Sequence, residues 1–173
     1  YEFDEISIRG WNSFFRVKKS GKCGYYKSSG ELIIPTHYDN LEGFYNSKFD
    51  HLLKATLHDS VGVISLKNEI IVPIRYKFVN DINNYFQVEL NGKRGLYSLK
   101  GEEICKPEFD RIFKSHAEKS NILFITKNNL IGIIGNDGAL LFEPQFVNIG
   151  FIHDEDLMVS PISSYYGIFQ YVK

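Results

Sequence analysis

The sequence is poor in cysteine, methionine and tryptophan, and the shortage of cysteine excludes some classes of protein. Its 173 residues include two cysteines, Cys23 and Cys105, one methionine, and one tryptophan, Trp11. Two cysteines in a chain of this size make neither a disulfide framework nor a C-x-x-C pair for structural zinc. Because they fall in different copies of the repeat described below, we expect both thiols to be free.

Long hydrophobic runs and an excess of one charge are also missing. No stretch of about 18 apolar residues occurs, so we expect no membrane insertion. No signal peptide opens the sequence, and this favours a cytoplasmic location only slightly, leaving localisation unknown. The 20 Lys and Arg against 21 Asp and Glu give a net charge of −1, so nucleic acid is not an expected partner.

Motifs that carry catalytic chemistry are absent as well. There is no G-x-S-x-G nucleophile turn, no G-x-x-x-x-G-K-[ST] phosphate loop, and no H-E-x-x-H or C-x-x-C metal motif. The segment His153-Asp154-Glu155-Asp156 groups oxygen ligands, but a solvated loop explains it as well. We therefore expect no enzyme activity, no catalytic residues, no metal and no cofactor.

What the sequence does have is a phrase that occurs four times. Each copy starts at a glycine that is followed by an apolar pair, a turn, a second apolar run, a proline and an aromatic residue. The glycines are Gly24, Gly62, Gly95 and Gly132, at steps of 38, 33 and 37 residues. The prolines are Pro35, Pro73, Pro107 and Pro144. Repeats with a period of this length indicate an array of similar structural units.

The distance from glycine to aromatic is the most constant feature of these copies. It is 14 residues in all four, and the aromatic residues are Tyr38, Tyr76, Phe109 and Phe146. An aliphatic residue follows three positions later: Leu41, Val79, Ile112 and Ile149. A slip of one residue would turn a strand's side chains to the other face, so these positions should hold fixed places in a packed unit.

The pattern predicts an all-β fold of tandem antiparallel hairpin or meander repeats. A strand precedes each glycine, and tight turns such as Asn91-Gly92 separate it from the next strand. We expect about four units of 33–38 residues, near 14–51, 52–84, 85–121 and 122–160, in a single repeat domain over 1–173. Partial copies at both ends predict a piece of a longer solenoid-like array; the alternative is a closed or partly closed propeller-like toroid.

These features together resemble the WG (KWG) repeat of bacterial proteins. Gly21-Lys22-Cys23-Gly24 and Gly92-Lys93-Arg94-Gly95 carry its opening, and Gly30 to Pro35 with Tyr38-Asp39 carry its middle. The copies are divergent, because the tryptophan of the motif is replaced in each of them. The resemblance implies an all-β repeat with a binding or scaffolding role, and no catalytic residues.

An aspartate beside the aromatic recurs in several copies, as Asp4, Asp39 and Asp110. A catalytic residue usually occurs once, so repetition argues for a structural role, in which the carboxylate accepts hydrogen bonds from backbone amides of a turn. Lys77 and Val147 hold this position in the other copies.

The function we expect is non-enzymatic protein–protein interaction or scaffolding, with another protein or another domain of a longer chain as partner. Two alternatives stay open: an immunity or inhibitor protein that blocks a toxin or nuclease, and a cell-wall or glycan-binding module. Residues outside the repeat register are the candidates for partner binding, since Trp, Tyr and Arg dominate binding hot spots. They are Trp11, Tyr45, Tyr85, Arg111 and Tyr165.

Overall fold

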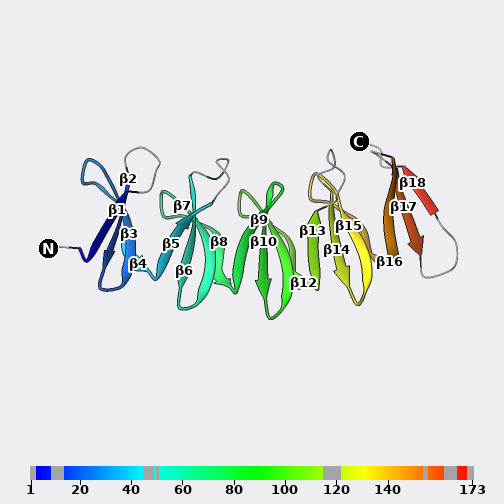
Figure 1. Ribbon diagram of the computed structural model, residues 1–173, viewed down its shortest axis with the longest axis horizontal. Helices are drawn as coiled ribbons and strands as arrows, with labels where there is room; N and C mark the ends of the chain where they lie inside the picture. The colour runs from blue at the N-terminus through cyan, green and yellow to red at the C-terminus, as the bar shows by residue number, and fades with distance from the viewer. Residues whose placement is uncertain are drawn as a thin grey trace. The chain divides into compact units, whose positions relative to one another are not determined.

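The computed structural model describes residues 3–8, 14–44, 49, 51–114, 122–153, 156–161 and 167–170, with side chains described as far as residue 149. Backbone contacts divide the chain into two compact units, Tyr1–Val79 and Asn80–Lys173. We call them the N-terminal unit and the C-terminal unit, and each is described by itself. The elements are antiparallel β-strands (Figure 1).

The N-terminal unit contains two four-stranded sheets whose strands lie side by side in chain order. The first sheet consists of β1 (Glu5–Ile8), β2 (Phe14–Lys19), β3 (Lys22–Lys27) and β4 (Leu32–Tyr38). The second sheet consists of β5 (Asn40–Gly43), β6 (Leu52–Leu57), β7 (Ser60–Ser65) and β8 (Ile70–Tyr76).

The C-terminal unit contains a four-stranded third sheet and a six-stranded fourth sheet. The third sheet consists of β9 (Phe78–Ile82), which begins just before the division, β10 (Tyr85–Leu90), β11 (Lys93–Ser98) and β12 (Glu103–Phe109). The fourth consists of β13 (Arg111–Lys114), β14 (Leu123–Lys127), β15 (Leu130–Ile134), β16 (Leu140–His153), β17 (Asp156–Pro161) and β18 (Gly167–Gln170). The long β16 pairs first with β15 and then with β17. The predicted fold class, tandem antiparallel all-β repeats, is confirmed.

Two-residue turns join the second and third strands of each sheet. Both central residues have positive φ in all four: Ser20 and Gly21, His58 and Asp59, Asn91 and Gly92, Asn128 and Asn129. Positive φ at both positions is the signature of the type I′ turn, whose twist matches that of the flanking strands. The sequence predicted tight turns only in the first and third copies, because the other two contain no glycine.

A bulge opposite each repeat glycine explains the constant 14-residue spacing. Cys23 pairs with Tyr38 and Tyr25 with Ile34, so residues 35–37 lie opposite Gly24 alone. The same arrangement surrounds the other three repeat glycines. Proline suits a bulge because its missing N–H is not needed there. The proline takes the first or the second place of this segment, while the aromatic that ends it stays at a fixed distance.

The glycine itself is required by close approach of the bulged strand. A Cβ on Gly24 would lie 2.5 Å from the carbonyl oxygen of Ile34, 2.9 Å from the carbonyl carbon of Pro35 and 2.9 Å from the amide nitrogen of Thr36. The other three glycines would place a Cβ 2.5 to 2.7 Å from the equivalent carbonyl oxygens. Only a residue without a side chain fits opposite the bulge.

The sheets are offset from the predicted units by one strand. The strand that follows the aromatic opens the next sheet: β5 pairs with β6, and β13 pairs with β14. The predicted boundaries at 14–51, 52–84, 85–121 and 122–160 therefore leave the first strand of each sheet in the preceding unit. The sequence pattern predicted the positions of strands but not which of them hydrogen-bond to one another.

Within each unit the core lies between its two sheets. In the N-terminal unit one cluster joins Cys23, Tyr25, Ile34 and Tyr38 of the first sheet to Leu41, Leu53, Ala55 and Ile64 of the second. In the C-terminal unit a second cluster joins Ile82, Tyr85, Leu96 and Phe109 of the third sheet to Ile112, Leu123, Ile125 and Ile134 of the fourth. Within the described ranges, no helical segment has the length and apolar character that a membrane crossing needs.

Candidate functional site

Two of the five predicted partner-binding residues can be placed in the structure. Trp11, Tyr45 and Tyr165 lie outside the described residues. Tyr85 starts β10 and Arg111 starts β13. No described contact joins Tyr85 to Arg111, so the structure does not gather the predicted residues into one site.

Tyr85, one of the predicted partner-binding residues, does not lie on the exposed surface. Its side chain is 6% exposed and belongs to the core cluster of the C-terminal unit. The hydroxyl donates a hydrogen bond to the Asn136 carbonyl at 3.0 Å, and burial raises the pKa of this hydroxyl. Tyr85 begins the second strand of its sheet, as Phe14 and Leu52 do, so the packing of the repeat accounts for it.

Arg111 is exposed and lies beside an aromatic ring of its own strand. Its guanidinium carbon is 5.4 Å from the centre of the Phe113 ring, a cation–π distance.

The most unusual surface of the described residues is one face of the first sheet. The strand register places Ile6 beside Val17, and Ile8 beside Phe15 and Tyr26, on the same side. We call these five side chains the open face. Ile6 is 61% exposed and Ile8 is 78% exposed, Phe15 and Tyr26 are half-buried, and Val17 is buried beneath them at 2%.

The repeat positions of Ile6 and Tyr26 are covered in the second and fourth sheets, whereas the equivalents of Ile8, Gly43 and Lys114, are exposed. The equivalents of Ile6 are Leu41, which is 0% exposed, and Ile112, which is 5% exposed. The equivalents of Tyr26 are Ile64 and Ile134, at 0% and 1%. Leu41 and Ile64 pack on the first sheet, and Ile112 and Ile134 pack on the third. The first sheet therefore exposes a surface of the kind that sheet-to-sheet packing covers elsewhere in this chain.

A shallow groove of about 350 Å³ runs over the open face. Phe3, Ile6, Phe15 and Tyr26 line it, with the Ser28–Gly30 turn at its end. The Phe3 and Tyr26 rings meet edge to face with centres 5.4 Å apart, and the Lys19 ammonium is 6.0 Å from the centre of the Phe3 ring. The groove is therefore mainly aromatic and aliphatic, and such contiguous apolar surface often marks an interaction site.

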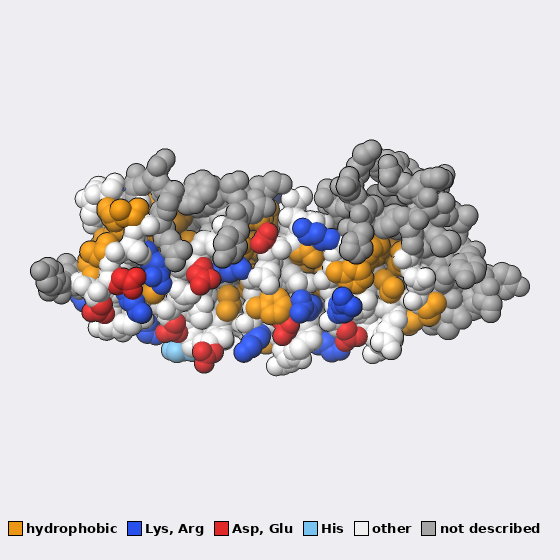
Figure 2. Space-filling model, viewed as in Figure 1, with side chains coloured by type: hydrophobic (Ala, Val, Ile, Leu, Met, Phe, Trp, Pro, Cys, Tyr) orange, Lys and Arg blue, Asp and Glu red, His pale blue; other side chains and the backbone are white. Residues whose placement is uncertain are grey.

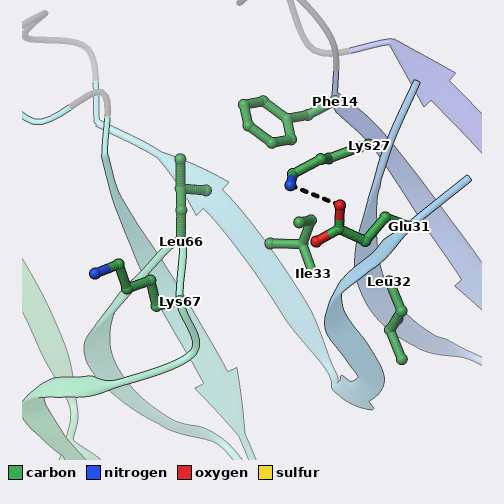
Figure 3. A pocket seen from close by; sticks show the side chains of 7 residues that line it. All are labelled: Phe14, Lys27, Glu31, Leu32, Ile33, Leu66 and Lys67. Carbon is green, nitrogen blue, oxygen red and sulfur yellow. Dashed lines mark hydrogen bonds and ion pairs between the residues drawn. The ribbon is translucent and has the colours of Figure 1, made fainter. Parts of the chain in front are cut away.

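A second groove, of about 360 Å³, lies where the first and second sheets meet. Phe14 and Ile33 of the first sheet and Leu66 of the second form its apolar part, and the Lys27–Glu31 ion pair, at 2.7 Å, borders it (Figure 3). In the C-terminal unit the Tyr85 hydroxyl, at the position of Phe14, reaches across to Asn136. The phenylalanine has no hydroxyl to make this contact.

Two of the four lysines of the first hairpin are paired with carboxylates. Lys22 pairs with Asp39 at 2.5 Å, and Lys27 pairs with Glu31. On the face shown in Figure 2, basic and acidic side chains alternate along the surface and form no field of one sign. Single-stranded nucleic acid binds in positively charged grooves lined by aromatic side chains, and the carboxylates beside Lys22 and Lys27 reduce the positive charge of this hairpin.

The repeated aspartates hold adjacent sheets together, as the sequence predicted for a structural role. One carboxylate oxygen of Asp39 accepts the amide of His58, in the hairpin turn of the second sheet, at 2.7 Å. Its other oxygen accepts Lys22 of the first sheet at 2.5 Å. Asp110 is arranged in the same way, between Asn128 of the fourth sheet and Lys93 of the third. We call each arrangement a lysine–aspartate clamp.

The clamps also shift the acidity of their carboxyl groups. The hydrogen bond from Lys22, and then that from the His58 amide, lower the pKa of Asp39 below its usual 3.8. Lys93 and the Asn128 amide likewise lower the pKa of Asp110 below 3.8. These directions agree with carboxylates that accept charged and backbone donors at once.

Acid should therefore weaken the fold through these two carboxylates. Because their pKa is lower in the folded state, the unfolded chain binds more protons in this range, and stability falls as pH drops through the folded pKa, below 3.8. We expect the wild type to be more stable than the Asp39→Asn, Asp110→Asn double variant at neutral pH. The urea midpoints of the two chains should converge between about pH 4 and about pH 2. A difference that stays constant with pH would contradict this assignment.

The two thiols offer no activated nucleophile. Both cysteines are free, as predicted. Cys23 is fully buried, and burial raises the pKa of Cys105 to about 12. A thiol with such a pKa stays protonated and unreactive near neutral pH. Among the described residues, no group of three or more His, Cys, Asp or Glu is placed to hold a metal ion.

The sheets, bulges and clamps define a tandem antiparallel β-repeat protein. Residues 24–49 and 62–93 match the family model described as WG containing repeat. This match confirms the resemblance to the WG repeat drawn from the sequence. Comparison with curated proteins gives no match.

Several solved structures are similar to the chain at low identity. Kluyveromyces lactis Hsv2 matches at 10% identity with a TM-score of 0.37, over 98% of this chain and 62% of that one. A eukaryotic initiation factor matches at 11% and 0.43, over 95% and 51%. The N-terminal domain of Nup159 matches at 9% and 0.39, over 99% and 59%. The chain thus spans less than two thirds of the length of each of these three.

Proposed function

We propose that this chain is a non-enzymatic protein–protein interaction module of a WG-repeat protein, and that it docks its partner on the open face. One observation carries the proposal. Ile6 is 61% exposed at a repeat position whose equivalents, Leu41 and Ile112, are 0% and 5% exposed. A partner that covers this face would remove apolar side chains from water, at about 25 cal/mol per Å² of apolar surface.

The residues around the open face are suited to binding a protein. Phe3, Phe15 and Tyr26 give large rigid contact surfaces with few rotatable bonds, and Lys19 adds a polar edge. The lysine–aspartate clamp behind the first sheet fixes it to the second sheet, so the face is held by a packed core. A face held in this way loses little conformational entropy when a partner binds.

The chemistry of the described residues supports a binding role over a catalytic one. The Cys105 thiol is protonated, and the Asp39 and Asp110 carboxylates are engaged in clamps. Grooves of the size found here can hold a side chain or a short peptide segment, and the Glu31 carboxylate that lines the second groove is paired with Lys27.

A charged side chain in the open face should weaken partner binding strongly. Wild type, Ile6→Lys and Ile70→Lys chains would each be used to capture proteins from an extract of the source cells. Ile70 is a matched control, because it is 63% exposed and lies on the second sheet, away from the open face. We expect the Ile6→Lys chain to bind the captured protein at least about 30-fold more weakly, the loss typical of a hot-spot residue, and the control to bind normally.

The opposite pattern would overturn the proposal. Equal loss in the Ile6→Lys and Ile70→Lys chains would show that the open face is not the docking surface. Tight binding of a small molecule with no protein captured would show that the chain is not a protein-interaction module.

A further inference from the structure

The hydrogen-bond partners of the repeated aspartates indicate which side chain a sheet covering the open face would place beside Asp4. In each clamp one carboxylate oxygen accepts a turn amide of the sheet that the aspartate precedes. The other oxygen accepts a lysine of the sheet before it. Asp39 and Asp110 both follow this rule, with Lys22 and Lys93 as the lysines.

Asp4, at the start of the first sheet, has one half of this arrangement. Its Oδ2 accepts the Ser20 amide at 2.6 Å, and its own amide donates to the Lys18 carbonyl at 2.8 Å. The second contact is repeated by Asp39 and Asp110, whose amides donate to Thr56 and Thr126. Among the described residues, no lysine is paired with Asp4. Its Oδ1 is the oxygen that binds the lysine of the preceding sheet in the other two copies.

Asp4 and the open face are separate features that point to the same occupant. The open face lacks the apolar cover that its equivalents receive in the second and fourth sheets. Asp4 lacks the lysine that the covering sheet supplies in both cases. In the chain, the side that covers Leu41 and Ile64 is built from Cys23, Tyr25, Ile34 and Tyr38, none more than 6% exposed.

We propose that the open face is the docking site for a WG-type β-sheet of a partner chain, which places the lysine of a G-K-x-G turn against Asp4 Oδ1. This inference rests on the proposed function and names the partner's chemistry. The covering side of that sheet is aromatic and aliphatic, as in the first sheet here, and its lysine is the single charged contact that fixes the register. Charge pairs at the edge of an apolar interface serve specificity in this way.

A second copy of this chain fits the docking site less well. The two lysines of this kind among the described residues, Lys22 and Lys93, are already bound to Asp39 and Asp110. The sides of the first and third sheets that carry these lysines are already covered by the second and fourth sheets. A folded second copy would have to break a clamp and a core to occupy the open face through these sheets.

The test supplies one WG-type sheet at high local concentration. A duplicate of residues 5–38 is joined directly ahead of Asp4 of the otherwise full chain, which reproduces the natural Tyr38–Asp39 junction. Ile6 is replaced by cysteine in both the extended and the original chain, and its alkylation rate reports whether the open face is covered. We expect Ile6→Cys to react at least about 100-fold more slowly in the extended chain, as at a position that opens only by local unfolding.

The lysine is tested by exchanging charges. Changing the duplicate's Lys22 to Asp should speed alkylation of Ile6→Cys about tenfold, because two carboxylates then face each other. Adding Asp4→Lys should restore the slow rate. Protection that does not respond to either exchange would overturn the lysine contact. Equal alkylation rates in the extended and original chains would overturn the docking of a WG-type sheet.

Three further outcomes separate this proposal from its alternatives. If the original chain becomes protected as its own concentration rises, a second copy covers the face and the proposal is wrong. If Ile6→Lys abolishes capture of a protein while the extended chain is not protected, the open face binds a protein partner that is not a WG-type sheet. Protection in the extended chain with no protein captured would support docking of a WG-type sheet and contradict the protein-interaction function.

Discussion

Gly24→Ala should destabilise the protein by about 3 kcal/mol, the upper end of the usual cost of forcing extra volume into a packed site. The added Cβ would lie 2.5 Å from the Ile34 carbonyl oxygen and 2.9 Å from two further backbone atoms of the bulge. Backbone atoms cannot turn aside as a flexible side chain can, so the β3–β4 pairing must shift. Alanine is favoured over glycine in a strand by only about 0.5–1 kcal/mol. The clash outweighs this gain, so Gly24→Ala lowers the stability of the fold.

Gly43→Ala is the matched control for this prediction. Gly43 ends β5, and a Cβ there would meet no atom within 4 Å. We expect its effect to stay within about 0.5 kcal/mol, as for most surface substitutions. Urea unfolding of the two variants and the wild type, followed by circular dichroism, measures the difference. Equal stabilities for the two variants would show that the bulge yields easily and that glycine is not required there.

The strands and their order could be predicted from the sequence because the repeat constrains them several times over. The strands predicted ahead of Gly62 and Gly95 are β6 and β10. The fixed glycine-to-aromatic distance has a simple physical cause in the bulge. It could be recognised without knowing that cause, because the same spacing recurs in every copy.

Other features depend on pairing between segments that a sequence pattern does not show. The type I′ turn at His58-Asp59 has no glycine or Asn-Gly pair to announce it. The sequence also did not predict that a new sheet begins after each aromatic residue. The residues of a strand do not indicate which neighbouring strand it hydrogen-bonds to. Tyr85 was chosen as a binding candidate because its repeat position holds a different residue type in each copy, among them Phe14 and Leu52.

The open face was missed for a further reason. Its residues fit the repeat pattern as well as those of the covered sheets, so Ile6 looks like Leu41 in the sequence. The residues that stand out in the sequence, such as Trp11 and Tyr45, are those that differ between copies. The unusual surface instead lies at regular repeat positions. Ile6 of the first sheet is exposed, whereas Leu41 and Ile112 are buried against a neighbouring sheet. Periodicity predicts which side chains face a neighbouring sheet, and only coordinates show whether a neighbour is present.

Leu41→Ala and Ile6→Ala should differ sharply, although they remove aliphatic side chains from the same repeat position. Leu41 is 0% exposed between the first two sheets, and its truncation leaves a cavity that should cost about 2–5 kcal/mol. Ile6 is 61% exposed, so its truncation should cost about 0.5 kcal/mol or less. The urea midpoints of the two variants, measured at low protein concentration, give the comparison.

The size of the Ile6→Ala effect also tests whether the open face is open in solution. A cost close to that of Leu41→Ala would mean that Ile6 is buried in the free protein. If that cost fell on dilution, the cover would be a second copy of the chain, because association stabilises by mass action. A small cost that does not change with protein concentration would leave the open face free. An added partner should then raise the cost of Ile6→Ala toward that of Leu41→Ala, since the partner would recreate the buried environment of the second sheet.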